Sequence, residues 1–189
     1  MIFLKRYITF LTVASVSLLL LGGLVFSTFA LSARQATHAS NGSSNGSSHE
    51  DLRAGLNGFQ QVPSILSNGK GTFTATINSS SSSISYTLTY SGLSSPALFS
   101  HIHFAQRGVN SAIFAFLCGG GGKPACPPNG GTVSGTITAA DILAITTQGL
   151  AAGDFAGAVR AIESGNTYVN VHTTNFPGGE IRGQIQSND

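Results

Sequence analysis

The chain has 189 residues, of which 41% are hydrophobic and only 8% are charged, and its formal net charge is +2. Two of the nine Lys and Arg residues, Lys5 and Arg6, fall within residues 1–30, which contain no Asp or Glu, so the rest of the chain has seven basic and seven acidic side chains. A balanced charge excludes the electrostatic footprint of a nucleic-acid-binding protein, although the sequence pI is 8.7.

Residues 1–30 have the layout of an export signal. Lys5 and Arg6 precede an apolar run at about 8–25, and small residues follow at Thr28 and Ala30. The run is also long enough to cross a bilayer uncut, so this segment is predicted to be a signal peptide or a signal anchor. In both cases the remainder lies outside the cytoplasm. We therefore expect a secreted or extracytoplasmic protein, with membrane contact only through an uncleaved N-terminal segment.

Residues 31–50 are rich in Ser, Gly and Asn and show no apolar periodicity, which is typical of a flexible linker. Residues 51–187 form the predicted domain. In the segments 73–77 and 84–90, apolar side chains alternate with Ser or Thr, which is the period of a half-buried strand. Two antiparallel sheets packed face to face bury such strands, so an all-β sandwich is predicted. Further strands are expected at about 52–60, 99–105, 112–117, 131–137, 167–173 and 180–185, making about eight in all.

A short helical connection is predicted near residues 139–164. Thr138 and Asp141 have capping-box spacing, and Ile142, Leu143 and Ile145 follow at helical intervals. A second helix is expected to begin at about residue 154 and to stop at residue 165, which is glycine.

Cys118 and Cys126 are the two cysteines of the chain. In an exported protein a disulfide is the default for such a pair, and it would close a small loop within the Gly- and Pro-rich stretch 119–131. Metal ligation by the two thiols is the alternative, but the pair lacks the CxxC spacing of zinc sites. The stapled loop is a second candidate binding site because long exposed loops often carry binding surfaces.

Five segments of the domain carry a family resemblance. They are LNGFQQVP at 56–63, YTLTYSGL at 86–93, SHIH at 100–103, YVNVHT at 168–173 and PGGEIRGQ at 177–184. Over about residues 51–186 the chain resembles the CHRD domain, which is repeated in chordin and found singly in many bacterial exported proteins. The resemblance implies an extracellular, immunoglobulin-like β-sandwich and no established reaction. The growth-factor partner of chordin is not carried over, because the cysteine-rich modules of chordin are missing here.

Three histidines form the main candidate site. Strand alternation places His101 and His103 on one face, and His172 shows the same alternation in a later strand. If the two strands pair, three imidazoles converge. One interpretation is a Cu or Zn site with an open fourth position. The other is a structural cluster whose ring nitrogens donate to backbone carbonyls or to Glu180.

Glu180 and Arg182 share a face of the last strand. One interpretation is an exposed edge-strand ion pair that discourages aggregation. The other makes Glu180 the carboxylate that orients a metal-binding histidine.

Two functions remain open from the sequence. The first is a non-catalytic extracellular binding or structural module whose partner is an unknown extracellular protein or cell-surface component. The second is a Cu- or Zn-binding protein. No nucleophile arrangement indicates an enzyme. A redox activity like that of the copper/zinc superoxide dismutases is a weaker alternative, because two of the five histidines, His38 and His49, fall in the linker and leave too few for paired metal sites.

Overall fold

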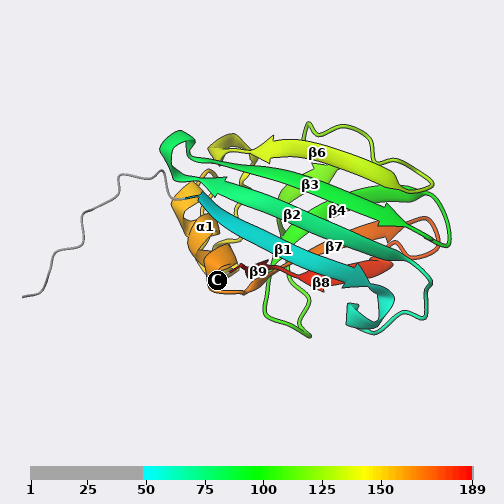
Figure 1. The fold of residues 1–189 in the computed structure, drawn as a ribbon. Helices are drawn as coiled ribbons and strands as arrows, with labels where there is room; N and C mark the ends of the chain where they lie inside the picture. The colour runs from blue at the N-terminus through cyan, green and yellow to red at the C-terminus, as the bar shows by residue number, and fades with distance from the viewer. Residues whose placement is uncertain (1–48, 189) are drawn as a thin grey trace, which may run out of the picture. The chain divides into compact units, whose positions relative to one another are not determined.

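Nine antiparallel strands form the framework of residues 49–188, the part of the chain that the computed structural model describes (Figure 1). The predicted export signal and nearly all of the predicted linker lie outside these residues. The strands are β1 (His49–Asn57), β2 (Lys70–Asn78), β3 (Ser83–Ser91), β4 (Ala97–Phe104), β5 (Ile113–Cys118), β6 (Gly131–Ile137), β7 (Thr167–Thr173), β8 (Ile181–Gln184) and β9 (Gln186–Ser187).

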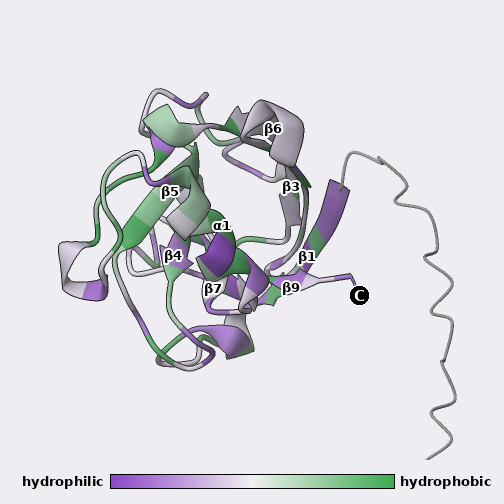
Figure 2. Cartoon of the chain, turned by 90° about the vertical axis from the view of Figure 1, so that its left-hand side faces the viewer, coloured by the Kyte–Doolittle hydropathy of each residue, from purple (hydrophilic) through white to green (hydrophobic). Residues whose placement is uncertain are grey.

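Hydrogen bonds join these strands into one nearly closed sheet in the order β5-β4-β7-β8-β1-β2-β3-β6, with β9 added beside β1. The β8–β1 junction consists of a single register pair, Asn57 with Arg182. The sheet therefore has two four-stranded halves. Figure 2 looks along the strands and shows them arranged around a ring. The all-β prediction is confirmed, and the two expected layers are halves of one sheet.

The core fills the inside of this ring. Alternation along β1, β2 and β3 points side chains such as Leu52, Phe73 and Leu88 inward, where each is at most 2% exposed. From the other half of the sheet, Ile102 and Val169 meet them. The Tyr86 hydroxyl on β3 donates to the Leu117 carbonyl on β5 at 2.6 Å, which ties the two halves together across the core.

The predicted helical connection is confirmed in part. The helix α1 (Phe155–Glu163) begins after Asp154, whose carboxylate accepts from the Gly157 amide, and it ends before Gly165, whose φ is +70°. The Thr138–Asp141 capping box is also present, but it starts only a 3-10 turn (Ala139–Asp141) because Ile142 is already extended. α1 lies across one end of the ring (Figure 2). Within residues 49–188, no helix has both the length and the apolar character needed to cross a membrane.

The outer face of β4, β7 and β8 forms a second, polar core. Its side chains are at most 9% exposed although they point away from the ring: His101, His103, Tyr168, Asn170, His172, Arg182 and Gln184. The loop 105–112 covers part of this face. It is held there because His103, Arg182 and Gln184 all hydrogen bond to its backbone carbonyls. This covered outer face is where the candidate site lies.

Candidate metal centre

The three predicted histidines converge, because β4 pairs with β7. In that register His101 is opposite Asn170, and His172 is opposite Phe99, so His101 and His172 are diagonal neighbours on one face. His103 follows two residues after His101 on the same face. One nitrogen from each of the three rings lies within 4.8 Å of the others.

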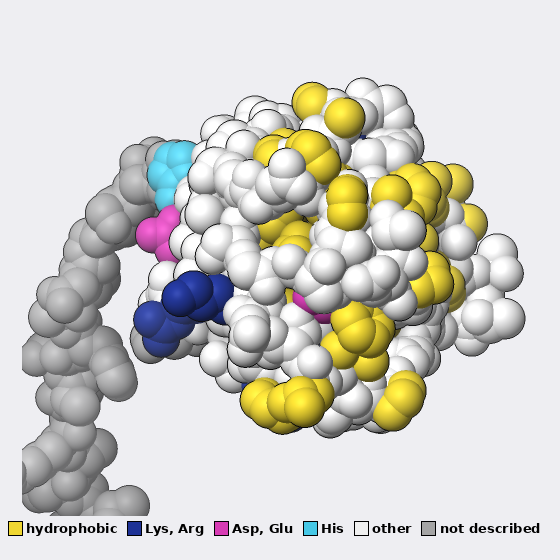
Figure 3. All heavy atoms as spheres, turned by 90° about the vertical axis from the view of Figure 1, so that its right-hand side faces the viewer, with side chains coloured by type: hydrophobic (Ala, Val, Ile, Leu, Met, Phe, Trp, Pro, Cys, Tyr) yellow, Lys and Arg dark blue, Asp and Glu magenta, His cyan; other side chains and the backbone are white. Residues whose placement is uncertain are grey.

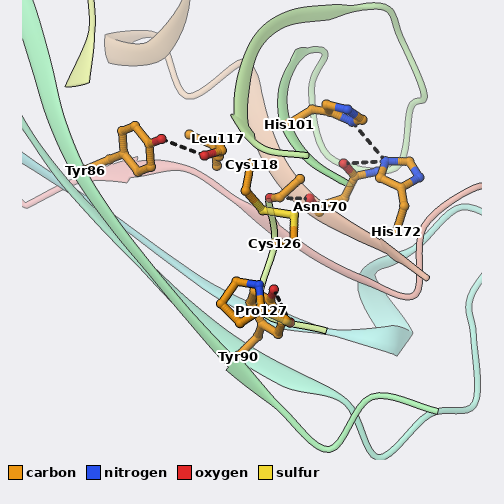
Figure 4. Close-up of a disulfide and its surroundings, with 10 residues drawn as sticks. Tyr86, Tyr90, His101, Leu117, Cys118, Cys126, Pro127, Asn170 and His172 are labelled. Atoms are coloured by element: carbon orange, nitrogen blue, oxygen red, sulfur yellow. Dashed lines mark hydrogen bonds between the residues drawn. A yellow bond between two sulfur atoms is a disulfide. The ribbon is translucent and has the colours of Figure 1, made fainter. Parts of the chain in front are cut away.

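Direct contacts tie the cluster together. The His101 Nδ1 atom lies 3.2 Å from the His172 Nε2 atom (Figure 4). The Nε2 atoms of His103 and His172 each lie 3.0 Å from the Asn170 side-chain oxygen. Asn170 therefore lies between two histidines, and strand alternation places it on their face.

Two of the rings are oriented by backbone carbonyls. The Nδ1 group of His103 donates to the Ser111 carbonyl at 2.9 Å, and the Nδ1 group of His172 donates to the Pro177 carbonyl at 2.8 Å. A neutral imidazole carries one N–H, so in both rings Nε2 presents a lone pair toward the centre of the cluster. This tautomer, with its outer nitrogen hydrogen-bonded, is the one in which metal-binding histidines are usually held.

The Asn170 amide can complement these lone pairs in a metal-free protein. Its oxygen and nitrogen ends are isosteric, and we assign the NH2 end toward the two Nε2 atoms, where it donates to both. The amide oxygen then turns toward the side of Gly179, where the Nε2 atom of Gln61 is buried without another partner. The two N–H groups of the amide then match the two Nε2 lone pairs.

Burial keeps the imidazoles neutral. It lowers the pKa of His101 to about 3, with further lowering by the His172 and His103 charges. It lowers the pKa of His103 to about 4, although the hydrogen bond to Ser111 opposes the shift. The pKa of His172 is also lowered by burial. Protons therefore do not compete for the ring nitrogens at neutral pH.

Aromatic side chains surround the cluster. The His101 ring lies edge-on to Phe116 at 4.5 Å and stacks with Phe99 at 6.0 Å. The His103 ring stacks on Tyr168 at 4.6 Å, with an angle of 1° between the planes. Of these aromatic neighbours Phe99 is 41% exposed, so its ring separates the His101 ring from solvent.

Glu180 is not placed against the histidines. Its carboxylate accepts from the Ser67 hydroxyl at 2.5 Å, the Ser94 amide and hydroxyl at 2.8 and 2.9 Å, and the Thr173 hydroxyl at 2.7 Å. The prediction that Glu180 orients a histidine is therefore wrong, because none of the groups that donate to its carboxylate is an imidazole. Burial acts to raise the pKa of Glu180, but these hydrogen bonds outweigh it and leave the pKa below its usual value. Through these hydrogen bonds Glu180 instead connects the loops that contain Ser67 and Ser94 to Thr173 at the end of β7.

Glu180 and Arg182 do not form the exposed ion pair that the sequence also suggested, because both are at most 1% exposed. The Arg182 guanidinium carbon lies 3.4 Å from the Tyr168 ring centroid. Its nitrogens donate to the Asn110 side chain and to the carbonyls of Gln106 and Val109. The Arg182 charge is thus buried against an aromatic ring and neutral acceptors.

Cys118 and Cys126 form a disulfide, with 5.0 Å between their Cα atoms. Directly after this disulfide loop, the Pro127 carbonyl accepts a hydrogen bond from the Tyr90 hydroxyl at 2.8 Å (Figure 4). Figure 3 shows the loop end of the domain, where apolar side chains spread over the face and charged ones are few. In the 58–69 loop, Phe59 and Leu66 are 66% and 87% exposed.

Several functional candidates did not come from the sequence. Asn170 could have been found, since it precedes His172 by two residues and so shares its face. Tyr168 could have been found in the same way, because it precedes Asn170 by two residues and shares that face. The contacts of Glu180 with Ser67 and Ser94, and the loop that covers Arg182, have no local signal, because they join residues far apart in the chain.

Together these features define an all-β, disulfide-bonded domain with a buried histidine cluster on the outer wall of its sheet. A family model described as the CHRD domain matches residues 52–185. The chain therefore belongs to the CHRD domain family. Comparisons with curated proteins and with solved structures find no match.

Proposed function

We propose that the protein is a non-catalytic extracellular binding module that holds one Cu or Zn ion through His101, His103 and His172. The observation that carries the proposal is the convergence of three neutral imidazoles within 4.8 Å, two of them oriented by backbone carbonyls. Three nitrogen ligands with one further position suit both metals.

One nitrogen pair of the cluster already has tetrahedral spacing, whereas the three nitrogens together span up to 4.8 Å, so the rings would draw closer when an ion binds. Ligands at about 2.0 to 2.1 Å from a tetrahedral ion lie roughly 3.3 Å from one another. The His101–His172 nitrogen separation is 3.2 Å, and the Asn170 oxygen position lies 3.0 Å from the Nε2 atoms of His103 and His172. Asn170 can therefore serve as the fourth ligand by turning its amide oxygen inward when the ion binds.

Burial favours a bound ion over a reaction at that ion. The residues His101, His103 and His172 are 5%, 6% and 9% exposed, so the site has little room for a substrate beside the metal. The family and the disulfide support an extracytoplasmic location, since disulfides persist in oxidising compartments. The apolar loop end in Figure 3 is the surface we assign to an extracellular protein or cell-surface partner.

Metal titration of the purified full-length protein tests the proposal. We expect one Cu(II) or Zn(II) ion per chain, and loss of that binding in the His101→Ala, His103→Ala double variant. His49→Ala is the matched control because His49 is exposed and outside the cluster. A single variant, His103→Gln, keeps a polar side chain at the site in case the double variant does not fold. Equal binding by wild type and both cluster variants would refute the metal site.

A further inference from the structure

A separate cavity of about 370 Å³ lies beside the polar core, between the 59–64 segment and the start of the 105–112 loop. Arg107, Arg182, Gln184 and Phe59 are among the residues that line it. None of its lining residues is acidic. Its volume is within the range of small-molecule sites.

The two arginines give this cavity an uncompensated positive charge. Arg182 is 1% exposed and bonds only to neutral acceptors, and Arg107 donates to the Gln60 side chain at 3.0 Å. The ion pair found among residues 49–188 joins Lys123 and Asp141 instead. Burial lowers the pKa of Arg182, Tyr168 opposes that shift, and the nearby charge of Arg107 lowers the pKa further. A buried charge without a counterion is costly, so an anion that bound here would be stabilised by both residues.

Gln184 is a second buried polar residue that lines the cavity. Its Nε2 group donates to the carbonyls of Ala105 and Gly165, both at 2.9 Å, which fixes the orientation of the amide. The Oε1 atom that remains is buried and has no partner. A ligand that carries an O–H or N–H group could satisfy it. The apolar side of the cavity is supplied by Phe59, which is 66% exposed.

We propose that this cavity binds a small organic acid that has a carboxylate, a neighbouring hydroxyl or amino group, and an apolar body. The carboxylate accepts hydrogen bonds from Arg107 and Arg182, the neighbouring group donates toward Gln184, and the apolar body packs on Phe59. Arginine is suited to this role because its planar guanidinium binds carboxylates through paired hydrogen bonds. The proposal is independent of the metal site and concerns a different ligand.

Calorimetric titration of metal-free, full-length protein with mandelate tests the cavity, because mandelate combines all three groups. We expect saturable binding of one mandelate per chain and no saturable binding of mandelamide, which replaces the carboxylate with a neutral amide. Arg107→Gln is expected to weaken mandelate binding by about tenfold or more, through loss of a charge-assisted hydrogen bond. Arg53→Gln, an exposed arginine on β1, is the matched control and should bind as wild type.

Three results would overturn the proposal: no saturable mandelate binding, equal binding of mandelate and mandelamide, or unchanged binding by Arg107→Gln. Arg107 is exposed, so its replacement should leave the fold intact, and a thermal melt checks this directly. Because the titration uses metal-free protein, its failure says nothing against the metal site, and failure of the metal site leaves it valid.

Discussion

The Nε2 atoms of His103 and His172 lie at the same distance, 3.0 Å, from one side-chain atom of Asn170. Each ring is held from its other side by a backbone carbonyl, so the two lone pairs are aimed at a common point. An amide at that point can donate to both lone pairs through its NH2 end, and in the proposed metal site it would turn its oxygen inward. Asn170 is thus the residue on which the arrangement of the cluster depends.

Replacing Asn170 with Asp should raise the pKa of His103. In the native protein burial lowers that pKa to about 4. A carboxylate about 3 Å from Nε2 favours the protonated ring and should return the pKa toward neutrality, by roughly 1 to 3 units. Histidine NMR signals followed through a pH titration measure this shift. An unchanged His103 pKa in Asn170→Asp would show that the side chain at position 170 does not face the ring.

The metal-free protein should lose stability as the pH falls from about 6.5 to 5. The pKa of His101 is lowered from 6.5 to about 3, so in this window the unfolded chain binds a proton that the folded chain does not. Each histidine that stays neutral then costs about 1.4 kcal/mol of unfolding free energy per pH unit of acidification. Urea unfolding at pH 7, 6 and 5 measures the slope.

The matched comparison is His101→Gln, which removes one titrating ring and should show a shallower slope between pH 6 and 5. Identical slopes in the two proteins would mean that His101 is not neutral and buried. The measurements stop at pH 5 so that only histidines titrate in the range. The pKa of Glu180 is lowered, so its carboxylate becomes protonated, and its stabilising contribution is lost, only at a lower pH.

Glu180→Gln should lower the free energy of unfolding by about 2 to 4 kcal/mol, since it removes a buried charge that accepts hydrogen bonds from three loops and strands. The control is Glu163→Gln on α1. Glu163 is exposed and its pKa is raised by burial and by the neighbouring Glu50, so its neutralisation should change stability by no more than about 0.5 kcal/mol. Equal effects of the two substitutions would argue against the role assigned to Glu180.

The copper-loaded protein should not catalyse superoxide dismutation faster than the same concentration of free copper. His101, His103 and His172 are at most 9% exposed, so an ion held by their rings would have little surface open to superoxide. An assay of superoxide consumption with the His101→Ala, His103→Ala variant as a blank measures this. Activity well above free copper and absent from the variant would make the protein an enzyme.

The strands and the histidine face follow from local sequence patterns, whereas the burial of the charged residues does not. Alternation of apolar and polar residues locates β2 and β3, and it places His101 and His103 on one face. The same alternation makes Glu180 and Arg182 look like surface charges, because it identifies the outer face of the sheet. It cannot show that the 105–112 loop folds back over that face and buries Arg182. Such coverage depends on contacts between residues 70 or more positions apart.

The predicted start of a helix at Thr138 failed for a related reason. The capping box forms as expected, yet the amide of Leu143 donates to the Phe114 carbonyl on β5 at 2.9 Å and pulls the segment into extended structure. A tertiary hydrogen bond thus overrides a local helical preference. The Asp154 start of α1 succeeded because its apolar stripe packs on the core without such competition.

X-ray absorption spectroscopy of the Cu- or Zn-loaded full-length protein tests the central claim most directly. The proposed site predicts three imidazole ligands at about 2.0 to 2.1 Å and one oxygen ligand, with the imidazole signal lost in the His101→Ala, His103→Ala variant. Sulfur ligation, a shell of oxygen atoms alone, or an imidazole signal that survives in the variant would contradict it.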